Sequence, residues 1–397
     1  MLETVQADYE LKTYVRGHSQ ELYYLLLELA RIPAPSGQEE RRAAFCRDWL
    51  IAQGAKDVSM DEAGNVIWIY RPQCRRLIVF DAHMDVVFPD TEPLPMHEED
   101  GKIFCPGVGD DSANLAVLLM TAKYVAQSQP DTGRYGLMFV CGTCEEGLGN
   151  LKGSRRICEK YGERIEAFYA FDLYMHEYTA RAVGSLRYRV EVTARGGHSY
   201  HCFGNPNANV LLAELIRELY QIQVPGRGKT TYNVGMISGG TSVNTIAQKA
   251  ELLYEIRSDD EQDLKEMERI FRDTVEAFRQ KLKKNVGDGA VLQPESETEE
   301  VSVTQIGYRP CESGVDVEKR RKLFTNVEHS VEKVTAKRPL PIPCSTDCNI
   351  PLSMGIPAVC IGTCRGAGAH TREEYIEKDS LSEGLRIALE LLRSSCL

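Results

Sequence analysis

The chain has 397 residues, of which 43% are hydrophobic and 26% charged, as in an ordinary globular protein long enough for two domains. Its formal net charge of −11 disfavours nucleic acid and anionic membranes as partners, and no apolar run approaches the length of a membrane span. The 13 cysteines, many in apparent core strands, predict a protein of the reducing cytoplasm.

The first part of the chain is expected to form two helices and a hairpin, at residues 19–27, 38–53 and 58–70. Acids flank the apolar run within the first helix and no cleavage pattern follows it, so this run is not interpreted as a signal peptide. Ser36 can cap the second helix. Residues 77–80 are apolar without polar alternation, which is typical of a central strand covered on both faces. This strand ends at His83 and Asp85, and α/β proteins place their chemistry at that edge of the sheet.

Strands and helices then alternate. A small hairpin is expected in the loop at 89–107, strands at 135–141 and 167–171, and helices at 113–127 and 153–161. Asp110 and Asp111 precede the first of these helices, whose free N–H groups they are expected to cap. Glu145 and Glu146 follow one strand and Asp172 follows the next. This alternation predicts an α/β fold with a doubly wound, mostly parallel sheet.

The pattern changes in the middle of the chain. Strands are expected at 186–193, 231–237, 250–257 and 301–306, and helices at 207–223 and 260–284, which is the order of an α+β sandwich. Residues 283–300 are polar and acidic enough to form a mobile loop. The α/β pattern returns with helices at 318–336 and 380–392, a strand at 358–361 and a glycine-rich loop carrying His370. We therefore predict a catalytic domain of residues 1–183 and 309–397 with an inserted domain of residues 184–308.

Acids and histidines thus follow several strands of one sheet. The set is larger and richer in carboxylates than an ordinary single zinc site, and a pair of dications is the simplest way to neutralise it. Two bridged metals would activate a water and polarise a carbonyl, and the doubled Glu145 and Glu146 offer one ligand and one general base. For any single acid, helix capping remains an alternative.

Longer motifs surround these residues: Asp81-Ala82-His83-Met84-Asp85, Gly109-Asp110-Asp111, Glu145-Glu146-Gly147, Gly196-Gly197-His198-Ser199, Gly239-Gly240-Thr241-Ser242-Val243-Asn244, Ile256-Arg257-Ser258, Ser345-Thr346-Asp347 and Ala369-His370. Together they resemble the co-catalytic zinc exopeptidase and deacylase superfamily, which includes carboxypeptidase G, peptidase T, acetylornithine deacetylase, succinyl-diaminopimelate desuccinylase, aminoacylase and carnosinase. The resemblance covers nearly the whole chain and is strongest to a peptidase T-like branch. Ser112-Ala113-Asn114 departs from the pattern, because many members have Lys or Asn and then Gly there.

The resemblance implies two Zn²⁺ per chain, with Co²⁺ or Mn²⁺ as substitutes. It implies these metal ligands: Asp110 as the bridge, His83 and Asp172 on one metal, and Glu146 and His370 on the other. It further implies these other roles: Glu145 as general base, Asp85 as the residue that orients His83, His198 as the group that polarises the scissile carbonyl, and Asn244 and Arg257 as the pair that grips a substrate carboxylate. Members also tend to have a cis peptide between the residues matching Asp110 and Asp111.

The predicted activity is that of a metal-dependent amide hydrolase, most of all an exopeptidase that releases the N-terminal residue of small peptides. An N-acyl amino acid deacylase is the alternative enzyme, and a non-catalytic binding protein on the same scaffold is the alternative of another class. In dimeric relatives the inserted domains pair, so we expect a homodimer in which His198 reaches the partner's active site. Some residues are pocket candidates by proximity alone: His176, His201, Tyr174, Tyr200, Phe203 and Arg365.

Overall fold

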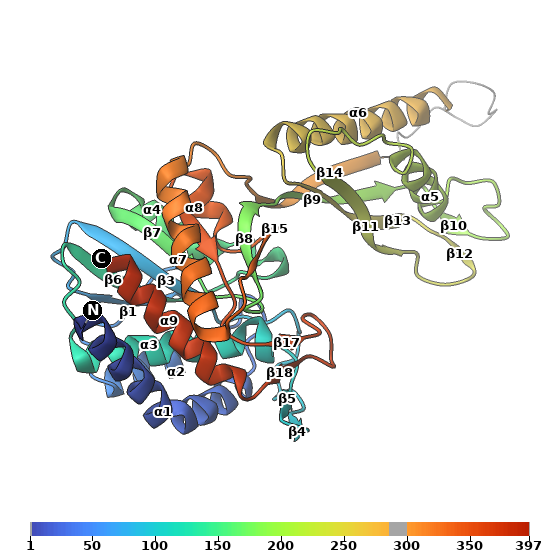
Figure 1. Cartoon of the computed structure of the whole chain (residues 1–397). Coiled ribbons are helices and arrows are strands. Elements are labelled where there is room, and N and C mark those ends of the chain that lie inside the picture. The colour runs from blue at the N-terminus through green and yellow to red at the C-terminus, as the bar shows by residue number, and fades with distance from the viewer. Residues whose placement is uncertain (1, 286–299, 397) are drawn as a thin grey trace. The chain divides into compact units, whose positions relative to one another are not determined.

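A computed structural model describes residues 2–285 and 300–396 and contains two compact units (Figure 1). Unit 1 comprises Met1–Ala182 and Glu312–Leu397, and unit 2 comprises Val183–Cys311. These boundaries lie a few residues from those expected from the sequence. Most of the expected mobile loop at 283–300 lies outside the described residues.

Unit 1 is built on a six-stranded sheet with the strand order β1-β2-β6-β3-β7-β16. The strands are β1 (Ser59–Met60), β2 (Val66–Tyr70), β3 (Arg76–His83), β6 (Tyr135–Gly142), β7 (Ile165–Ala170) and β16 (Ala358–Cys360). Strand β3 pairs in parallel with β6 and β7, and β16 pairs in parallel with β7. The predicted hairpin forms the antiparallel edge of the sheet. The predicted mostly parallel sheet is therefore confirmed, with the strand that ends in His83 at its centre.

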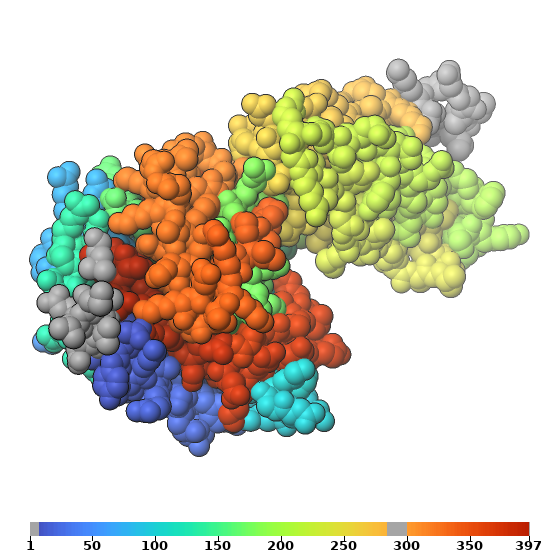
Figure 2. Space-filling model, in the orientation of Figure 1, coloured from blue at the N-terminus to red at the C-terminus, as the bar shows by residue number. Residues whose placement is uncertain are grey.

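Helices cover both faces of this sheet, which explains the uninterrupted apolar run in β3. One face packs against α1 (Leu2–Ala30), α2 (Glu40–Ala52), α3 (Asn114–Ser128), α7 (Val317–Thr335) and α9 (Ser380–Cys396). The other face packs against α4 (Lys152–Tyr161) and α8 (Asn349–Ser353). Ile78 and Phe80 belong to the first core, and Leu77 and Val79 to the second. Figure 2 shows residues of α7, in orange, covering much of the face of unit 1 that is turned to the viewer.

Smaller elements complete unit 1. A four-stranded sheet consists of β17 (Gly366–Ala367), β18 (Tyr375–Glu377), β5 (Lys102–Phe104) and β4 (His97–Glu99). Three short helical turns are η1 (Val108–Ala113), η2 (Gly147–Gly149) and η3 (Gly162–Arg164). The parallel pair β8 (Glu177–Ala182) and β15 (Leu340–Cys344) was not predicted. Pro341 and Pro343 interrupt any strand pattern in β15, because proline cannot donate to a sheet.

Unit 2 has a four-stranded antiparallel sheet of order β11-β13-β9-β14. Its elements are β9 (Gly184–Thr193), β10 (Gly197–His198), α5 (Ala208–Leu219), β11 (Thr230–Gly239), β12 (Thr245–Ile246), β13 (Lys249–Ser258), α6 (Glu261–Asn285) and β14 (Glu300–Arg309). Apolar residues of both helices pack on one face of the sheet, and β10 pairs with β12 in a small separate ribbon. The predicted sandwich order is present, with the short ribbon added.

Two expected helix caps are wrong. Within the described residues no side chain caps α3, which begins directly after the turn η1. Asp110 instead contacts the ring of His83, and Asp111 accepts the backbone N–H of His83. Ser36 does not cap α2 and donates its hydroxyl to Asp85 Oδ2 at 2.6 Å. Among the helices of residues 2–285 and 300–396, none is long and apolar enough to cross a membrane.

Candidate active site

The candidate site lies where the parallel strands of unit 1 end. Strand β3 ends in His83, the loop after β6 carries Glu145 and Glu146, and Asp172 follows β7. The turn η1 adds Asp110, and the loop after β16 leads to His370. Four carboxylates of this cluster are buried, with side chains at most a few per cent exposed: Asp110, Glu145, Glu146 and Asp172. Burial of so many acids together is costly unless positive charge compensates them.

Two groups of ligand atoms share Asp110. In the first group, His83 Nε2 lies 3.1 Å from Asp110 Oδ1 and 3.9 Å from Asp172 Oδ1. In the second, His370 Nε2 lies 3.1 Å from Asp110 Oδ2 and 3.0 Å from Glu146 Oε1. The ligand atoms of each group lie within 4.8 Å of one another. One Asp110 oxygen thus faces each histidine, which is the arrangement that a carboxylate bridging two cations requires.

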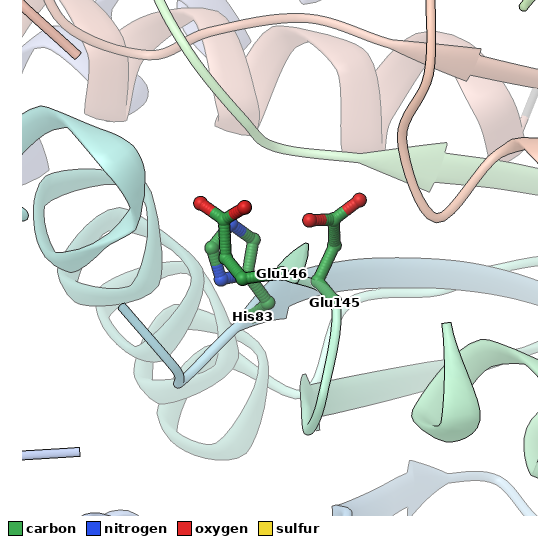
Figure 3. Close-up of side chains that lie close together, drawn as sticks. All are labelled: His83, Glu145 and Glu146. Atoms are coloured by element: carbon green, nitrogen blue, oxygen red, sulfur yellow. The ribbon is translucent and has the colours of Figure 1, made fainter. Parts of the chain in front are cut away.

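Glu145 lies beside both groups. Figure 3 shows Glu145 and Glu146 extending from one loop with both carboxylates on the same side, and the His83 ring next to Glu146. Glu145, Glu146 and His83 also offer ligand atoms within 4.8 Å of one another. The geometry therefore permits two uses of Glu145, as a general base beside the metals or as a metal ligand.

The electrostatics of the cluster favour cations. Burial and the neighbouring Asp110 raise the pKa of Asp172 to about 8. Hydrogen bonds to Asp110 and Glu146 raise the pKa of His370 to about 11. Burial opposes the charge on His83, yet Asp111, Asp110 and Asp85 raise its pKa well above the ordinary value. Two protonated histidines thus supply the positive charge that the cluster of acids requires.

The donor set fits divalent metal ions. Asp172 Oδ1 is buried and has no hydrogen-bond partner among the described residues, although a buried carboxylate oxygen is normally satisfied. Carboxylate oxygens and imidazole nitrogens are the ligands that catalytic zinc sites use. A cation between His83, Asp110 and Asp172 would satisfy this oxygen and displace the proton from the histidine.

Asp85 connects the two loops of the site. Its carboxylate accepts the backbone N–H groups of Glu145, at 3.0 Å, and Glu146, at 2.9 Å. The His83 ring Nδ1 lies 3.0 Å from the backbone carbonyl of Asp85 and 3.5 Å from its carboxylate. The Asp85 carbonyl is therefore the nearer partner of the imidazole, and the carboxylate positions the two glutamates.

Some residues that organise the site were not identified from the sequence. Glu374 is fully buried and accepts the backbone N–H groups of Gly107, Gly109 and Asp110, at 2.5, 2.9 and 2.9 Å. Burial and the charge of Asp110 raise the pKa of Glu374 to about 8. The buried Arg42 donates a hydrogen bond of 2.7 Å to the backbone carbonyl of Met84, the residue between His83 and Asp85. Neither residue belongs to a motif that a single sequence reveals.

Backbone geometry sets the direction of three site loops. Cys144, Leu173 and His370 have φ values of 55°, 61° and 65°, in the left-handed region that costs non-glycine residues energy. Cys144 immediately precedes Glu145, and Leu173 immediately follows Asp172. The peptide bond between Asp110 and Asp111 is cis, as the resemblance implies.

Unit 2 brings together two of its three expected site residues. His198 in β10 pairs with Thr245, and the N–H of Ser199 donates to the carbonyl of Asn244 at 3.0 Å. Arg257 lies at the opposite end of β13 from this ribbon, and its guanidinium is bonded to Glu255 at 2.8 Å. In this chain Arg257 is therefore not beside Asn244.

The ring of His198 has a defined hydrogen-bonding state. Its Nδ1 accepts the backbone N–H groups of Tyr200 and His201, at 3.2 and 3.4 Å. Because a neutral imidazole has one donor and one acceptor nitrogen, these contacts place the proton on Nε2. Tyr200 and Phe203 in the same loop are 82% and 91% exposed, which excludes core packing as their role within unit 2.

The remaining pocket candidates lie in unit 1. Arg365 pairs with Glu377 and Glu383, so its charge is engaged within the fold. Tyr174 packs against the site backbone, because a Cβ added to Gly109 would meet its ring at 2.8 Å. His176 is exposed.

Comparison with known proteins identifies a family and several relatives of this chain. Residues 79–394 match the family model described as peptidase family M20/M25/M40. A succinyl-diaminopimelate desuccinylase of Corynebacterium glutamicum is 26% identical, with 93% of this chain and 95% of that protein covered. A probable carboxypeptidase of Aspergillus clavatus is also 26% identical, but the match covers 58% of this chain and 56% of that protein.

A solved structure extends this likeness to the fold. The structure of a tripeptidase from Staphylococcus aureus superposes with a TM-score of 0.69 at 22% identity, covering 95% of this chain and 98% of that chain. These relatives carry different activities in their names, namely a desuccinylase, a carboxypeptidase and a tripeptidase.

Proposed function

We propose that this chain, which belongs to peptidase family M20/M25/M40 and is a metal-dependent hydrolase, is an exopeptidase. It would release the N-terminal residue of di- and tripeptides. The observation that carries this proposal is the pair of ligand groups that share Asp110, with the carboxylate of Glu145 beside them. The likeness to the tripeptidase fold supports the choice of small peptides.

Each residue of the cluster has a role in this proposal. Two divalent cations, with zinc as the expected metal, would polarise the scissile carbonyl and lower the pKa of the attacking water. His83 and Asp172 would hold one cation, Glu146 and His370 the other, and Asp110 would bridge them.

The remaining roles concern protons and charge. Glu145 would accept a proton from the attacking water and deliver it to the leaving amine. His198 carries its proton on Nε2 and could therefore donate it in a hydrogen bond to the carbonyl oxygen as negative charge develops there.

Substrate class is tested with paired substrates. A panel of tripeptides is compared with the same peptides acetylated at the N-terminus, using the zinc-loaded protein and measuring release of free amino acid. We expect cleavage of the free peptides and at least tenfold lower kcat/KM for the blocked ones, because an aminopeptidase recognises the free α-amino group. Cleavage restricted to the blocked peptides would overturn the exopeptidase proposal.

The second candidate is an N-acyl amino acid deacylase. The alignment with the desuccinylase over 93% of this chain favours it. Acetylated and succinylated amino acids belong in the same assay, and their preferential hydrolysis would establish this candidate. Both candidates use the same metals and the same base, so mutation of Glu145 does not distinguish them.

We also propose a homodimer formed through unit 2. Strand β11 lies at the edge of its sheet, where its outer backbone groups are available to a second strand. Met236 and Ile237 on this strand are 64% and 62% exposed, so this edge also presents apolar side chains to solvent. Pairing of two β11 strands around a twofold axis would cover both features. In such a dimer His198 would act in the active site of the partner.

Complementation tests this assembly. His198→Ala and Glu145→Gln are co-expressed with different tags, and mixed dimers are purified through both tags. About half of the wild-type activity per dimer should return, because each purified mixed dimer has one complete site out of two. Homodimers of each variant, purified in the same way, are the controls. Mixed dimers that remain inactive would show that His198 does not act across the interface.

A further inference from the structure

Asn114 lies at the start of α3, beside the candidate site, and is fully buried. Its amide nitrogen donates to the carbonyl of Gly109 at 3.0 Å and to the carbonyl of Leu173 at 3.1 Å. Its amide oxygen accepts the N–H of Thr363 at 2.6 Å and the hydroxyl of Thr363 at 2.7 Å. A side-chain amide has two donors and two acceptor positions, so every one of them is used.

These partners belong to three different site loops. Gly109 immediately precedes Asp110 and Leu173 immediately follows Asp172. Thr363 lies in the loop after β16, and the short strand β17 leads from this loop to the segment that carries His370. The separation of Asn114 from Thr363 is 249 residues, so these bonds join parts of the chain that nothing local holds together. Asn114 itself sits on α3, which packs in the main core of unit 1. It therefore connects three proposed ligand loops to one rigid helix.

We propose that Asn114 is a positioning residue for the metal centre, which sets the relative placement of Asp110, Asp172 and His370. The inference rests on the proposed two-metal site. Leu173 has a left-handed φ of 61°, a conformation that a non-glycine residue keeps only when its surroundings impose it. The hydrogen bond from Asn114 to the Leu173 carbonyl is one such constraint, and it keeps Asp172 directed toward His83.

The loop of Asp110, the proposed bridging ligand, is held from two sides. Asn114 binds the Gly109 carbonyl, while Glu374 accepts the N–H groups of Gly109 and Asp110. Glu374 lies in the segment that also carries His370 and joins that segment to this loop, whereas Asn114 also binds the loop of Asp172. Loss of the Asn114 amide should therefore change the distances between ligands on different loops, which a bridged pair of cations tolerates poorly.

The test compares variants of similar size. Asn114→Leu removes all four hydrogen bonds, and Thr363→Val removes only the one from the hydroxyl. Thr121→Val is the matched control, because it removes a buried hydrogen bond on the same helix, to the Val117 carbonyl at 2.7 Å, without touching a site loop. Each metal-free protein is titrated with Co²⁺, and metal content, visible absorption and thermal unfolding are measured.

We expect wild type to bind two Co²⁺ per chain and Asn114→Leu to lose about 10- to 100-fold in metal affinity with an altered Co²⁺ spectrum. Thr363→Val should show a smaller loss of Co²⁺ affinity. This variant tests the proposal even if Asn114→Leu does not fold. Thr121→Val should lower the unfolding temperature and keep the wild-type affinity and spectrum.

Two results would be adverse, and they are distinguishable. If wild type binds fewer than two ions, the two-metal proposal itself fails. If wild type binds two ions and both Asn114→Leu and Thr363→Val match Thr121→Val, with lower stability and unchanged Co²⁺ binding, then Asn114 only stabilises the fold and the positioning role is refuted.

Discussion

Loading the metal-free protein with divalent cations should release protons in a number that the site geometry determines. Imidazoles and carboxylates must be deprotonated to bind metal. Without metal, hydrogen bonds to Asp110 and Glu146 keep the pKa of His370 at about 11, and nearby carboxylates keep the pKa of His83 well above its ordinary value. Burial and Asp110 keep the pKa of Asp172 at about 8. All three groups are therefore mainly protonated at neutral pH.

The expected number of protons released is the sum of the protons that His83, His370 and Asp172 carry before metal binds. At pH 7 each histidine contributes about one proton and Asp172 about 0.9, so binding should release about three protons per chain or more. At pH 9 Asp172 is already ionised before metal binds, so the release should be smaller than at pH 7 by about the 0.9 proton that Asp172 contributes there. Because protons compete with metal, affinity should decrease as the pH is lowered.

Calorimetric titration with Mn²⁺ in buffers of different ionisation enthalpy measures the number of protons released. The variant His370→Asn removes one titrating ligand and should release about one proton fewer at pH 7. Glu145→Gln is the control that should leave the number unchanged if Glu145 is not a ligand. Release of less than one proton per chain by the wild-type protein would refute the assignment of both histidines as metal ligands.

Other substitutions test the separate roles of buried acids. Glu145→Gln should retain both metals and lose about 10²–10⁴ in kcat, as for removal of a general base, whereas Glu146→Gln should weaken one metal. Metal analysis with steady-state kinetics checks this, and the opposite pattern would exchange the two roles. Glu374→Gln turns an amide N–H toward the N–H of Gly107 and should reduce metal affinity about 10- to 100-fold in equilibrium dialysis; unchanged affinity would leave Glu374 with a purely structural role. Glu390→Ala breaks a buried network with Lys333, Arg386 and Arg393 and should lower the free energy of unfolding by about 3–5 kcal/mol without changing kcat. Its control, Glu318→Ala, removes an exposed ion pair with Arg321, and its free energy of unfolding should stay within about 0.5 kcal/mol of wild type. If both variants lower the unfolding temperature equally, burial does not explain the cost of losing Glu390.

The architecture of unit 1 and the residues of the candidate cluster could be predicted from the sequence. The run at residues 77–80 predicts a strand covered on both faces, because a short run of apolar residues without polar alternation is typical of such strands. Since parallel strands end at the same edge, acids and histidines that follow such strands must converge there. The residues expected at that edge do lie together, including His370, which is far from His83 along the chain.

The hydrogen bonds that hold these residues in place could not be predicted from the sequence. Patterns of hydrophobicity are local, whereas the hydrogen bonds of Glu374 and Asn114 join positions separated by more than 200 residues. Capping preferences are local as well, and they predicted the wrong partners for Asp110, Asp111 and Ser36. A buried carboxylate near imidazoles or amide N–H groups forms the stronger, charge-assisted bonds available there, and those partners exist only once the distant strands have assembled.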